Sequence, residues 1–171
     1  MKRLSSLFLS LMLLFSLTGC ADDMMYGVTV VTTGGSSQSQ SDASNAEEFL
    51  PTEGGYYYDL ENVVLYLDAY GELPDNYITK KEAQELGWQG GSVEKYLEGA
   101  AIGGDRFGNR EGLLPKEQGR SYTECDLNTH GESSRGAERL IFSNDGLYFH
   151  TEDHYETFTE VRVENGQVVE G

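Results

Sequence analysis

The hydrophobic pattern of this chain changes from helical to alternating near Gly103-Gly104, and this change limits the fold most strongly. Before it, apolar residues recur at helical spacing; after it, they alternate with polar residues in short runs. Helices followed by strands are typical of an α+β domain, in which helices cover one face of an antiparallel sheet. We therefore expect about three N-terminal helices packed on an antiparallel β-sheet.

Three segments before this change carry helix start and stop signals. The first spans residues 59–70, with Asp59 as N-cap and a glycine at its end. The second opens with a capping box formed by Thr79 and Glu82 and ends at Gly87. The third spans residues 92–99. In the first helix, the residues expected on one face are Val63, Val64, Leu67 and Tyr70.

The second half of the chain contains strand and hairpin signals. Asn144-Asp145-Gly146 predicts a tight turn between two strands, and Asn165-Gly166 predicts a further hairpin near the end. The predicted strands are residues 122–128, 140–143, 147–151 and 157–163.

The first 55 residues differ in composition from the rest. Residues 1–20 combine a basic pair with an apolar run too short to span a bilayer, which predicts an export signal. Residues 17–20 (LTGC) resemble the lipobox of bacterial lipoproteins, in which the cysteine, here Cys20, carries the lipid. Ordinary signal cleavage that leaves Cys20 as a free thiol is the alternative. Residues 21–55 are polar, small and acidic and predict a flexible tether.

The second cysteine, Cys125, follows a carboxylate in a predicted strand. A thiol nucleophile is one interpretation of this position. Neighbouring strand residues face opposite sides of the sheet, so Cys125 should point away from Glu124. A buried, inert cysteine is the interpretation we favour.

The stretch from Glu124 to His154 holds the strongest candidate for catalysis. It carries a carboxylate, two arginines four residues apart (Arg135 and Arg139) and a histidine, His154, that is expected to be exposed in a charged turn. A base and an acid on different strands suit in-line attack at phosphorus, and fixed cations stabilise the charge that develops on its oxygens. Solvated charges without a function are the alternative interpretation of this stretch.

Four ordered blocks of the chain resemble barnase-like extracellular guanyl-preferring bacterial ribonucleases. The resemblance covers about residues 58–162, so the domain is expected at 56–162, with a C-terminal extension at 163–171 that could form a short hairpin. The four blocks are residues 73–88 (LPDNYITKKEAQELGW), 102–105 (IGGD), 107–112 (FGNREG) and 153–159 (DHYETFT).

The resemblance implies a role for each matching residue. Glu124 corresponds to the general base and His154 to the general acid, while Lys80, Arg135 and Arg139 surround the scissile phosphate. The implied reaction needs no metal or other cofactor and leaves a 2′,3′-cyclic phosphate. The residues implied in substrate binding are Phe107, Gly108, Asn109, Arg110, Glu111 and Tyr155.

This chain departs from the family pattern in two places. The loop of residues 128–135 is one residue longer, which makes the placement of Arg135 less secure than that of Arg139. Gly108 replaces a serine, which should loosen the recognition loop or change its backbone. His130 in the longer loop is expected to be solvated rather than to act as the acid.

The net charge of −17 is unusual for a protein that binds RNA. Nonspecific affinity for nucleic acid comes largely from neutralised phosphates, so we expect weak binding to long RNA and a local positive pocket. The implied partners are RNA, a membrane through the N-terminal lipid, and a barstar-like protein inhibitor; DNA is not expected. The implied location is the extracytoplasmic face of the cell membrane or the exterior.

Two further hypotheses remain open from the sequence. The first is a catalytically weak, surface-anchored binding lipoprotein that has kept the ribonuclease fold. The second keeps the chemistry and assigns it the role of an antagonistic toxin. Retention of the complete set of candidate catalytic residues favours the enzyme over the binding protein.

Overall fold

The computed structural model describes residues 50–171. The predicted export signal at 1–20, the lipidation site Cys20, and residues 21–49 of the predicted tether lie outside the described residues. Within residues 50–171, no helix has the length and apolar character needed to cross a membrane.

The described residues form two α-helices, one 3-10 turn and a seven-stranded sheet. In chain order the elements are α1 (Leu60–Tyr70), β1 (Tyr77–Ile78), α2 (Lys80–Glu85), the 3-10 turn Val93–Lys95, β2 (Ala101–Phe107), β3 (Tyr122–Asp126), β4 (Arg139–Ser143), β5 (Tyr148–Thr151), β6 (Thr159–Glu164) and β7 (Gln167–Glu170).

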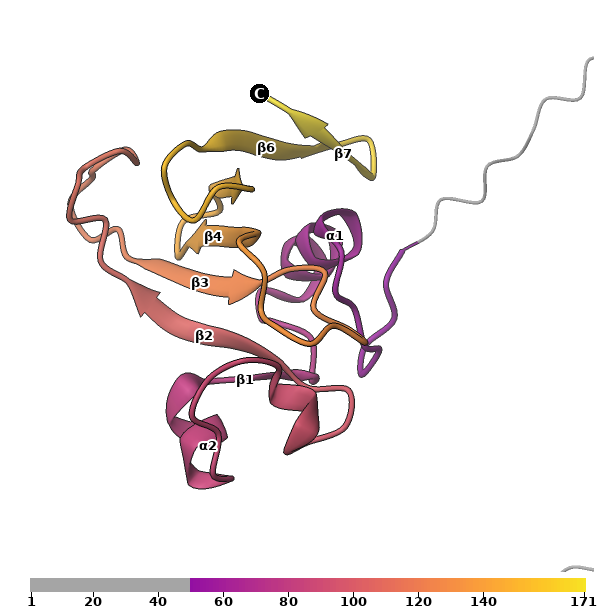
Figure 1. Cartoon of the computed structure of the whole chain (residues 1–171). Helices are drawn as coiled ribbons and strands as arrows, with labels where there is room; N and C mark the ends of the chain where they lie inside the picture. Colours follow the sequence, from indigo (N-terminus) through magenta and orange to yellow (C-terminus); the bar gives the residue numbers. More distant parts are fainter. Residues whose placement is uncertain (1–49) are drawn as a thin grey trace, which may run out of the picture. The chain divides into compact units, whose positions relative to one another are not determined.

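Each strand of the sheet pairs with the next one along the chain, from β1 to β7 (Figure 1). The β1–β2 pair is parallel and all the others are antiparallel. Helix α1 packs against the sheet, while α2 lies beside β1 and β2. The expected α+β arrangement of helix on antiparallel sheet is confirmed.

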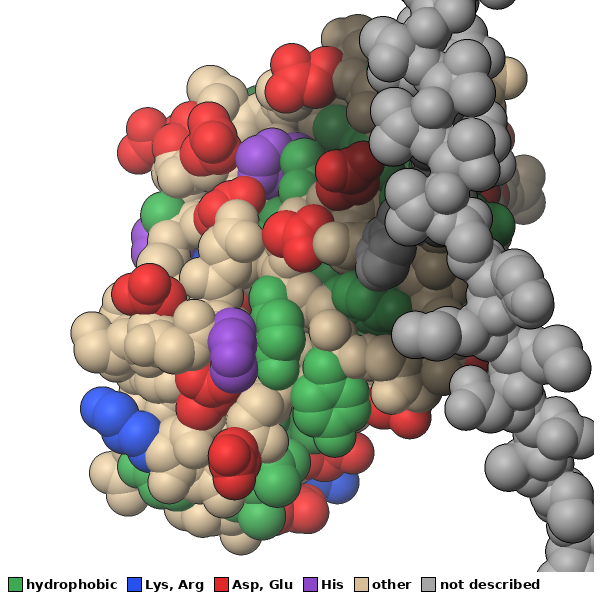
Figure 2. Space-filling model, turned by 90° about the vertical axis from the view of Figure 1, so that its right-hand side faces the viewer, with side chains coloured by type: hydrophobic (Ala, Val, Ile, Leu, Met, Phe, Trp, Pro, Cys, Tyr) green, Lys and Arg blue, Asp and Glu red, His purple; other side chains and the backbone are tan. Residues whose placement is uncertain are grey.

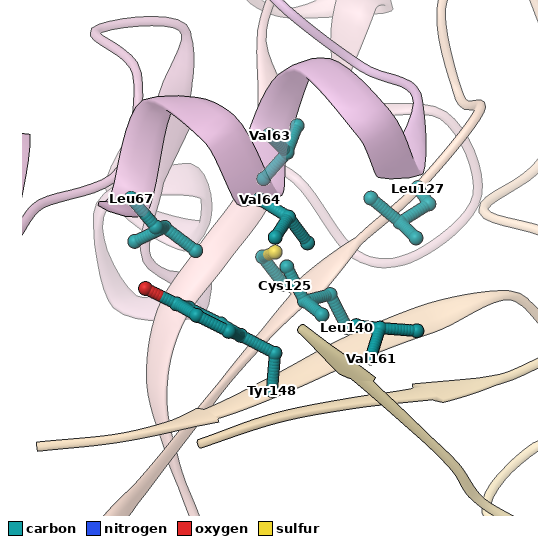
Figure 3. Close-up of a cluster of buried hydrophobic side chains, with 8 residues drawn as sticks. All are labelled: Val63, Val64, Leu67, Cys125, Leu127, Leu140, Tyr148 and Val161. Carbon is teal, nitrogen blue, oxygen red and sulfur yellow. The ribbon is translucent and has the colours of Figure 1, made fainter. Parts of the chain in front are cut away.

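Helix α1 begins and ends at its predicted caps. The Asp59 carboxylate accepts a hydrogen bond of 3.0 Å from the Asn62 amide, and Gly71 has a left-handed φ of 74° that lets its amide bond to the Leu67 carbonyl. The helix places apolar side chains on the sheet, where they form the main core (Figure 3). The core residues are Val63, Val64, Leu67, Cys125, Leu127, Leu140, Tyr148 and Val161.

One flank of α1 outside the main core is also covered by the segment that precedes the helix. Tyr70, predicted to face the core, is 39% exposed and instead donates a hydrogen bond of 3.0 Å to the Pro51 carbonyl. Pro51 is itself buried, although it falls within the predicted tether. Tyr66 is buried between the rings of Tyr57 and Tyr70, so residues 50–58 form a second layer over α1.

The third predicted helix, at residues 92–99, is wrong. Only the single 3-10 turn Val93–Lys95 forms there, and the Ser92 side chain makes no capping hydrogen bond. Val93 is the buried residue of the turn, whereas Leu97 is 45% exposed. A longer helix would bury no further apolar face here, and a short helix without such burial is not stable.

Strand β2 was not predicted because glycine is rare in strands. Its Gly103 lies so close to other elements that a Cβ atom would stand 2.6 Å from the Tyr77 ring and 2.7 Å from the Cys125 Cβ. The pairing of β2 with β3 shifts between Gly103 and Asp105, which marks a β-bulge. Glycine therefore serves close packing here rather than a loop.

The chain ends in a hairpin of β6 and β7, with Asn165 and Gly166 at its turn. Both turn residues have positive φ, 51° and 73°, as a two-residue type I′ turn requires. Val163 and Val168 pack at the edge of the main core, so the extension covers part of α1 and the sheet.

Candidate active site

Glu124 in β3 lies at the centre of a cluster of polar side chains. Its position in the register is opposite Asp105 of β2 and Ile141 of β4. One carboxylate oxygen, Oε1, forms an ion pair with the Lys80 ammonium, and the other, Oε2, accepts a hydrogen bond of 3.0 Å from the Tyr155 hydroxyl. The Glu124 side chain is 12% exposed, so the carboxylate is largely shielded from water yet retains an open side.

Lys80 is held in place by its main chain as well as by its side chain. It is the first residue of α2 and lies within the predicted capping box, in which Thr79 and Glu82 bond to each other's amides. The Lys80 amide donates a hydrogen bond of 2.8 Å to Asp105. The start of α2 therefore orients the Lys80 ammonium toward Glu124. The capping box that marks this start could be recognised in the sequence because its two residues are only three positions apart.

The two candidate arginines surround a carboxylate that was not predicted, that of Asp126. Arg135 Nε lies 2.5 Å from Asp126 Oδ2, and a terminal nitrogen of the same guanidinium lies 2.7 Å from Oδ1. Arg139 Nε lies 2.8 Å from Oδ1, although the angle there is too poor for a hydrogen bond. Asp126 follows Glu124 by two residues, and this period-2 spacing was the available sequence signal.

The two arginine side chains differ in how exposed they remain after these contacts. The Arg139 side chain is 3% exposed and donates to the carbonyls of Arg135, Gly136 and Glu138. The Arg135 side chain is 22% exposed and lies over the Trp88 ring at 5.7 Å. Burial disfavours the charge on Arg135, but its bonds to Asp126 outweigh this and raise its pKa. Arg135 is thus the more accessible cation, and Arg139 is a buried positive charge fixed by its carbonyl contacts.

His154 lies in an exposed loop between β5 and β6. The loop is built around the Asp153 carboxylate, which accepts hydrogen bonds from the hydroxyls of Thr151 and Thr157 and from the amides of Glu156 and Thr157, at 2.6–3.0 Å. These bonds, chiefly those from Thr157, lower the pKa of Asp153 to about 2. His154 and Tyr155 both have positive φ, 59° and 74°, so the carboxylate holds a strained backbone.

Tyr155 links the histidine loop to the carboxylate. Its ring centroid lies 6.0 Å from that of His154 and 5.5 Å from that of Phe107, and its hydroxyl reaches Glu124. Burial and the negative charge of Glu124 raise the pKa of Tyr155 to about 12. One side chain therefore connects the predicted acid, the predicted base and the predicted recognition loop.

The predicted recognition loop encloses a hollow of about 390 Å³ lined by residues 106–111. Asn109 is buried with a φ of 41°, and its amide side chain bonds both the carbonyl and the amide of Leu114, at 2.9 and 3.1 Å. The Asn109 side chain therefore closes the loop and is not free to contact a ligand. Gly108 lies outside the left-handed region, and a Cβ there would stand 3.4 Å from the Arg110 side chain.

Cys125 and His130, for which no catalytic role is expected, lie outside the cluster around Glu124. Cys125 points into the core beneath α1, and burial raises the pKa of its thiol well above the usual value. This agrees with the interpretation of an inert cysteine. The His130 side chain is 64% exposed, pairs with Glu94 at 2.6 Å and stacks on Tyr58.

Comparison with known proteins matches the part of the chain that holds these residues to ribonucleases. The family model described as ribonuclease matches residues 61–162. A ribonuclease of Bacillus pumilus is 36% identical over 166 residues, which are 95% of this chain and 100% of that protein. A ribonuclease of Bacillus intermedius is 47% identical over 104 residues, 60% of this chain and 64% of that protein. Guanyl-specific ribonuclease St of Saccharopolyspora erythraea is 46% identical over 55 residues, 32% of this chain and 54% of that protein.

Proposed function

The chain belongs to the ribonuclease family, and from this premise we propose that it cleaves single-stranded RNA on the 3′ side of guanosine without a metal ion. That it is a ribonuclease acting on RNA follows from the family. The proposal concerns the mechanism, the base preference and the location of the protein.

The observation that carries the mechanism is the grouping of Lys80, Glu124 and Tyr155 beside an exposed histidine. Glu124 takes the proton of the ribose 2′-hydroxyl while that oxygen forms a bond to phosphorus. The bond from phosphorus to the 5′-oxygen breaks, and His154 gives this oxygen a proton. The products are a 2′,3′-cyclic phosphate and a free 5′-hydroxyl, and slower hydrolysis with the two roles exchanged opens the ring.

The cations supply electrostatic stabilisation in this proposal. Negative charge builds up on the phosphoryl oxygens, and Lys80 and Arg135 provide donors at the accessible side of the cluster. Arg139 adds a fixed positive charge from its buried position. DNA lacks the 2′-hydroxyl that must attack, so it is not a substrate.

The guanosine preference rests on the loop of residues 107–111. A carboxylate such as that of Glu111 can accept hydrogen bonds from the guanine N1 and N2 hydrogens, which adenine does not present in the same arrangement. The name of one relative, guanyl-specific ribonuclease St, supports the same preference. Phe107 and Tyr155 supply aromatic surface next to the hollow.

The location is also part of the proposal. The signal-like residues 1–20 and Cys20 support export and lipid anchoring, either at the outer side of the cell membrane or with later release. A barstar-like inhibitor would place an acidic face against the cations of the site. The acidic surface of this protein elsewhere should repel that face and weaken its approach.

The test uses the purified protein and a short RNA with one internal guanosine, in excess EDTA. We expect cleavage after the guanosine, a 2′,3′-cyclic phosphate by mass spectrometry, and severe loss of activity in Glu124→Ala and His154→Ala. The matched controls are Glu132→Ala and His130→Ala, which alter exposed residues of another loop. A folded wild-type protein that leaves the RNA intact would contradict the mechanism and favour the surface-binding alternative.

A further inference from the structure

The cations of the described residues divide into paired and unpaired groups. Lys80, Lys81, Arg120, Arg135, Arg139 and Arg162 are in ion pairs with carboxylates. Within residues 50–171, Lys95, Arg106, Arg110 and Lys116 are not in any ion pair with those residues. Acidic side chains are spread over the surface in Figure 2, whereas lysine and arginine are sparse there. Three of the four unpaired cations nevertheless gather at residues 106–116.

Two of these cations border a hollow that the proposed reaction does not use. The hollow has a volume of about 260 Å³ and is lined by the segment 106–109 on one side and by residues 115–117 and 120–122 on the other. The segment 106–109 also lines the guanine-binding hollow of residues 106–111, here called the base hollow. The two hollows therefore share the segment 106–109 as a common wall.

Arg106 is placed on the opposite side of the sheet from the reacting groups. It pairs in register with Thr123, while its neighbours Asp105 and Phe107 pair with Glu124 and Tyr122. Because successive strand residues alternate faces, the Arg106 side chain leaves the sheet away from Glu124. Arg106 is also exposed, so its charge is accessible on this side of the sheet.

The other charged groups of this hollow are engaged locally. Arg120 binds both carboxylate oxygens of Asp145 at 2.7–2.9 Å, so its charge is largely neutralised. The Glu117 carboxylate accepts a hydrogen bond of 3.0 Å from the amide of the next residue and keeps its negative charge, which Arg106 and Lys116 together exceed. Lys116 places its ammonium over Gly112 of the recognition loop, where a Cβ would stand 3.2 Å from it. Arg106 and Lys116 thus supply the free positive charge at this hollow.

We propose that Arg106 and Lys116 form a subsite for a phosphate of the RNA strand on the 5′ side of the recognised guanosine. The inference rests on the proposed function, because the guanosine in the base hollow sets the direction of the strand. The phosphate 3′ of that guanosine lies at Glu124, so the phosphate that crosses the shared wall is the one on the 5′ side. Two unpaired cations there compensate locally for the repulsion between RNA and an acidic protein.

The experiment compares substrates that differ only in length on the 5′ side. Cleavage of GpU and of ApApGpU is measured for the wild type, Arg106→Ala, Lys116→Ala and the matched control Lys95→Ala, an exposed unpaired lysine of the 3-10 turn. Binding of uncleavable 2′-O-methyl versions of both RNAs is measured by fluorescence anisotropy at several salt concentrations. The binding arm needs no catalysis, so it reports on the subsite even if the reaction is absent.

We expect Arg106→Ala and Lys116→Ala each to lower the ratio of kcat/KM for ApApGpU to kcat/KM for GpU by about threefold to tenfold. For the longer RNA, the logarithm of the binding constant decreases linearly with the logarithm of the salt concentration. Each lost phosphate contact should reduce the magnitude of this slope by about 0.7. Lys95→Ala should match the wild type. An equal loss on both RNAs, or no loss on the longer one, would overturn the subsite. If the wild type cleaves neither RNA but binds the longer one more tightly in a way that requires Arg106, the proposed reaction is refuted and the subsite stands.

Discussion

The Tyr155 hydroxyl donates a hydrogen bond of 3.0 Å to Oε2 of Glu124. This contact joins the loop that carries His154 to the strand that carries the proposed general base. Lys80 occupies the other carboxylate oxygen, so Glu124 is oriented from both sides. The orientation of the base therefore depends on two elements distant from it in sequence, α2 and the β5–β6 loop.

Replacing Tyr155 by phenylalanine tests this orientation. We expect kcat/KM for GpU to fall about tenfold, because a hydrogen bond to a charged group is worth roughly 1.5–3 kcal/mol and part of it is regained from water. Tyr96→Phe, an exposed tyrosine, is the control. An unchanged rate would mean that Lys80 alone positions the carboxylate.

The raised pKa of Tyr155 predicts a loss of stability in strong alkali. The folded-state pKa is about 12 and the ordinary value is 10.0, so the stabilising contribution is present below pH 10 and disappears as the pH rises from 10 to 12. We expect the free energy of unfolding of Tyr155→Phe to fall less than that of the wild type across this range. Urea titrations at pH 9 and 11 measure the difference, and parallel behaviour of the two proteins would contradict it.

The lowered pKa of Asp153 predicts a loss of stability at acid pH, the opposite of the pH dependence that Tyr155 gives. Its pKa is about 2 in the folded protein against 3.8 ordinarily, so its contribution is complete above pH 3.8 and is lost as the pH falls toward 2. In Asp153→Asn this acid-dependent part should be absent, and kcat should fall because the strained backbone of His154 loses its bonds. Acid unfolding followed by circular dichroism checks the first point and the kcat for GpU cleavage checks the second, with the nearby exposed Glu152→Gln as control for both.

Asp126 should be essential for stability because it neutralises two arginines. Its side chain is 2% exposed, and breaking a buried pair by removal of one partner costs roughly 3–5 kcal/mol. We expect Asp126→Asn to lower the free energy of unfolding by about this amount. Glu164→Gln, which removes the exposed partner of Arg162, should change it by less than about 0.5 kcal/mol. Urea unfolding measures both, and similar values would refute the role assigned to Asp126.

Two glycines in and beside the recognition loop should respond differently to alanine. Gly112 has a φ of 70° and lies under the Lys116 ammonium, so Gly112→Ala should destabilise the protein by about 1–2 kcal/mol. Gly108 lies outside the left-handed region and meets only the flexible Arg110 side chain, so Gly108→Ala should stay within about 0.5 kcal/mol. Thermal unfolding of the two variants decides this, and equal destabilisation would contradict the difference in backbone conformation.

Much of the fold was predictable from short stretches of sequence. The N-caps Asp59 and Thr79 and the turn at residues 144–146 lie where local signals placed them. Strand β2 was missed because its glycines resemble a loop in sequence, and the predicted helix at 92–99 failed because its apolar residues have nothing to pack on. In both cases contacts with distant segments, rather than local preference, decided the structure.

The sequence by itself determined where α1, α2 and β3 begin, the alternation that puts Glu124 and Cys125 on opposite faces, and the residues able to do acid–base chemistry. Those properties depend on side chains within a few positions of one another. Only the tertiary structure decided that Asp126 holds both arginines, that Tyr155 reaches Glu124, and that the Asn109 side chain closes its own loop. Such partners are chosen by strand register and packing across the whole domain, because a buried charge or amide must find a partner wherever the fold places one.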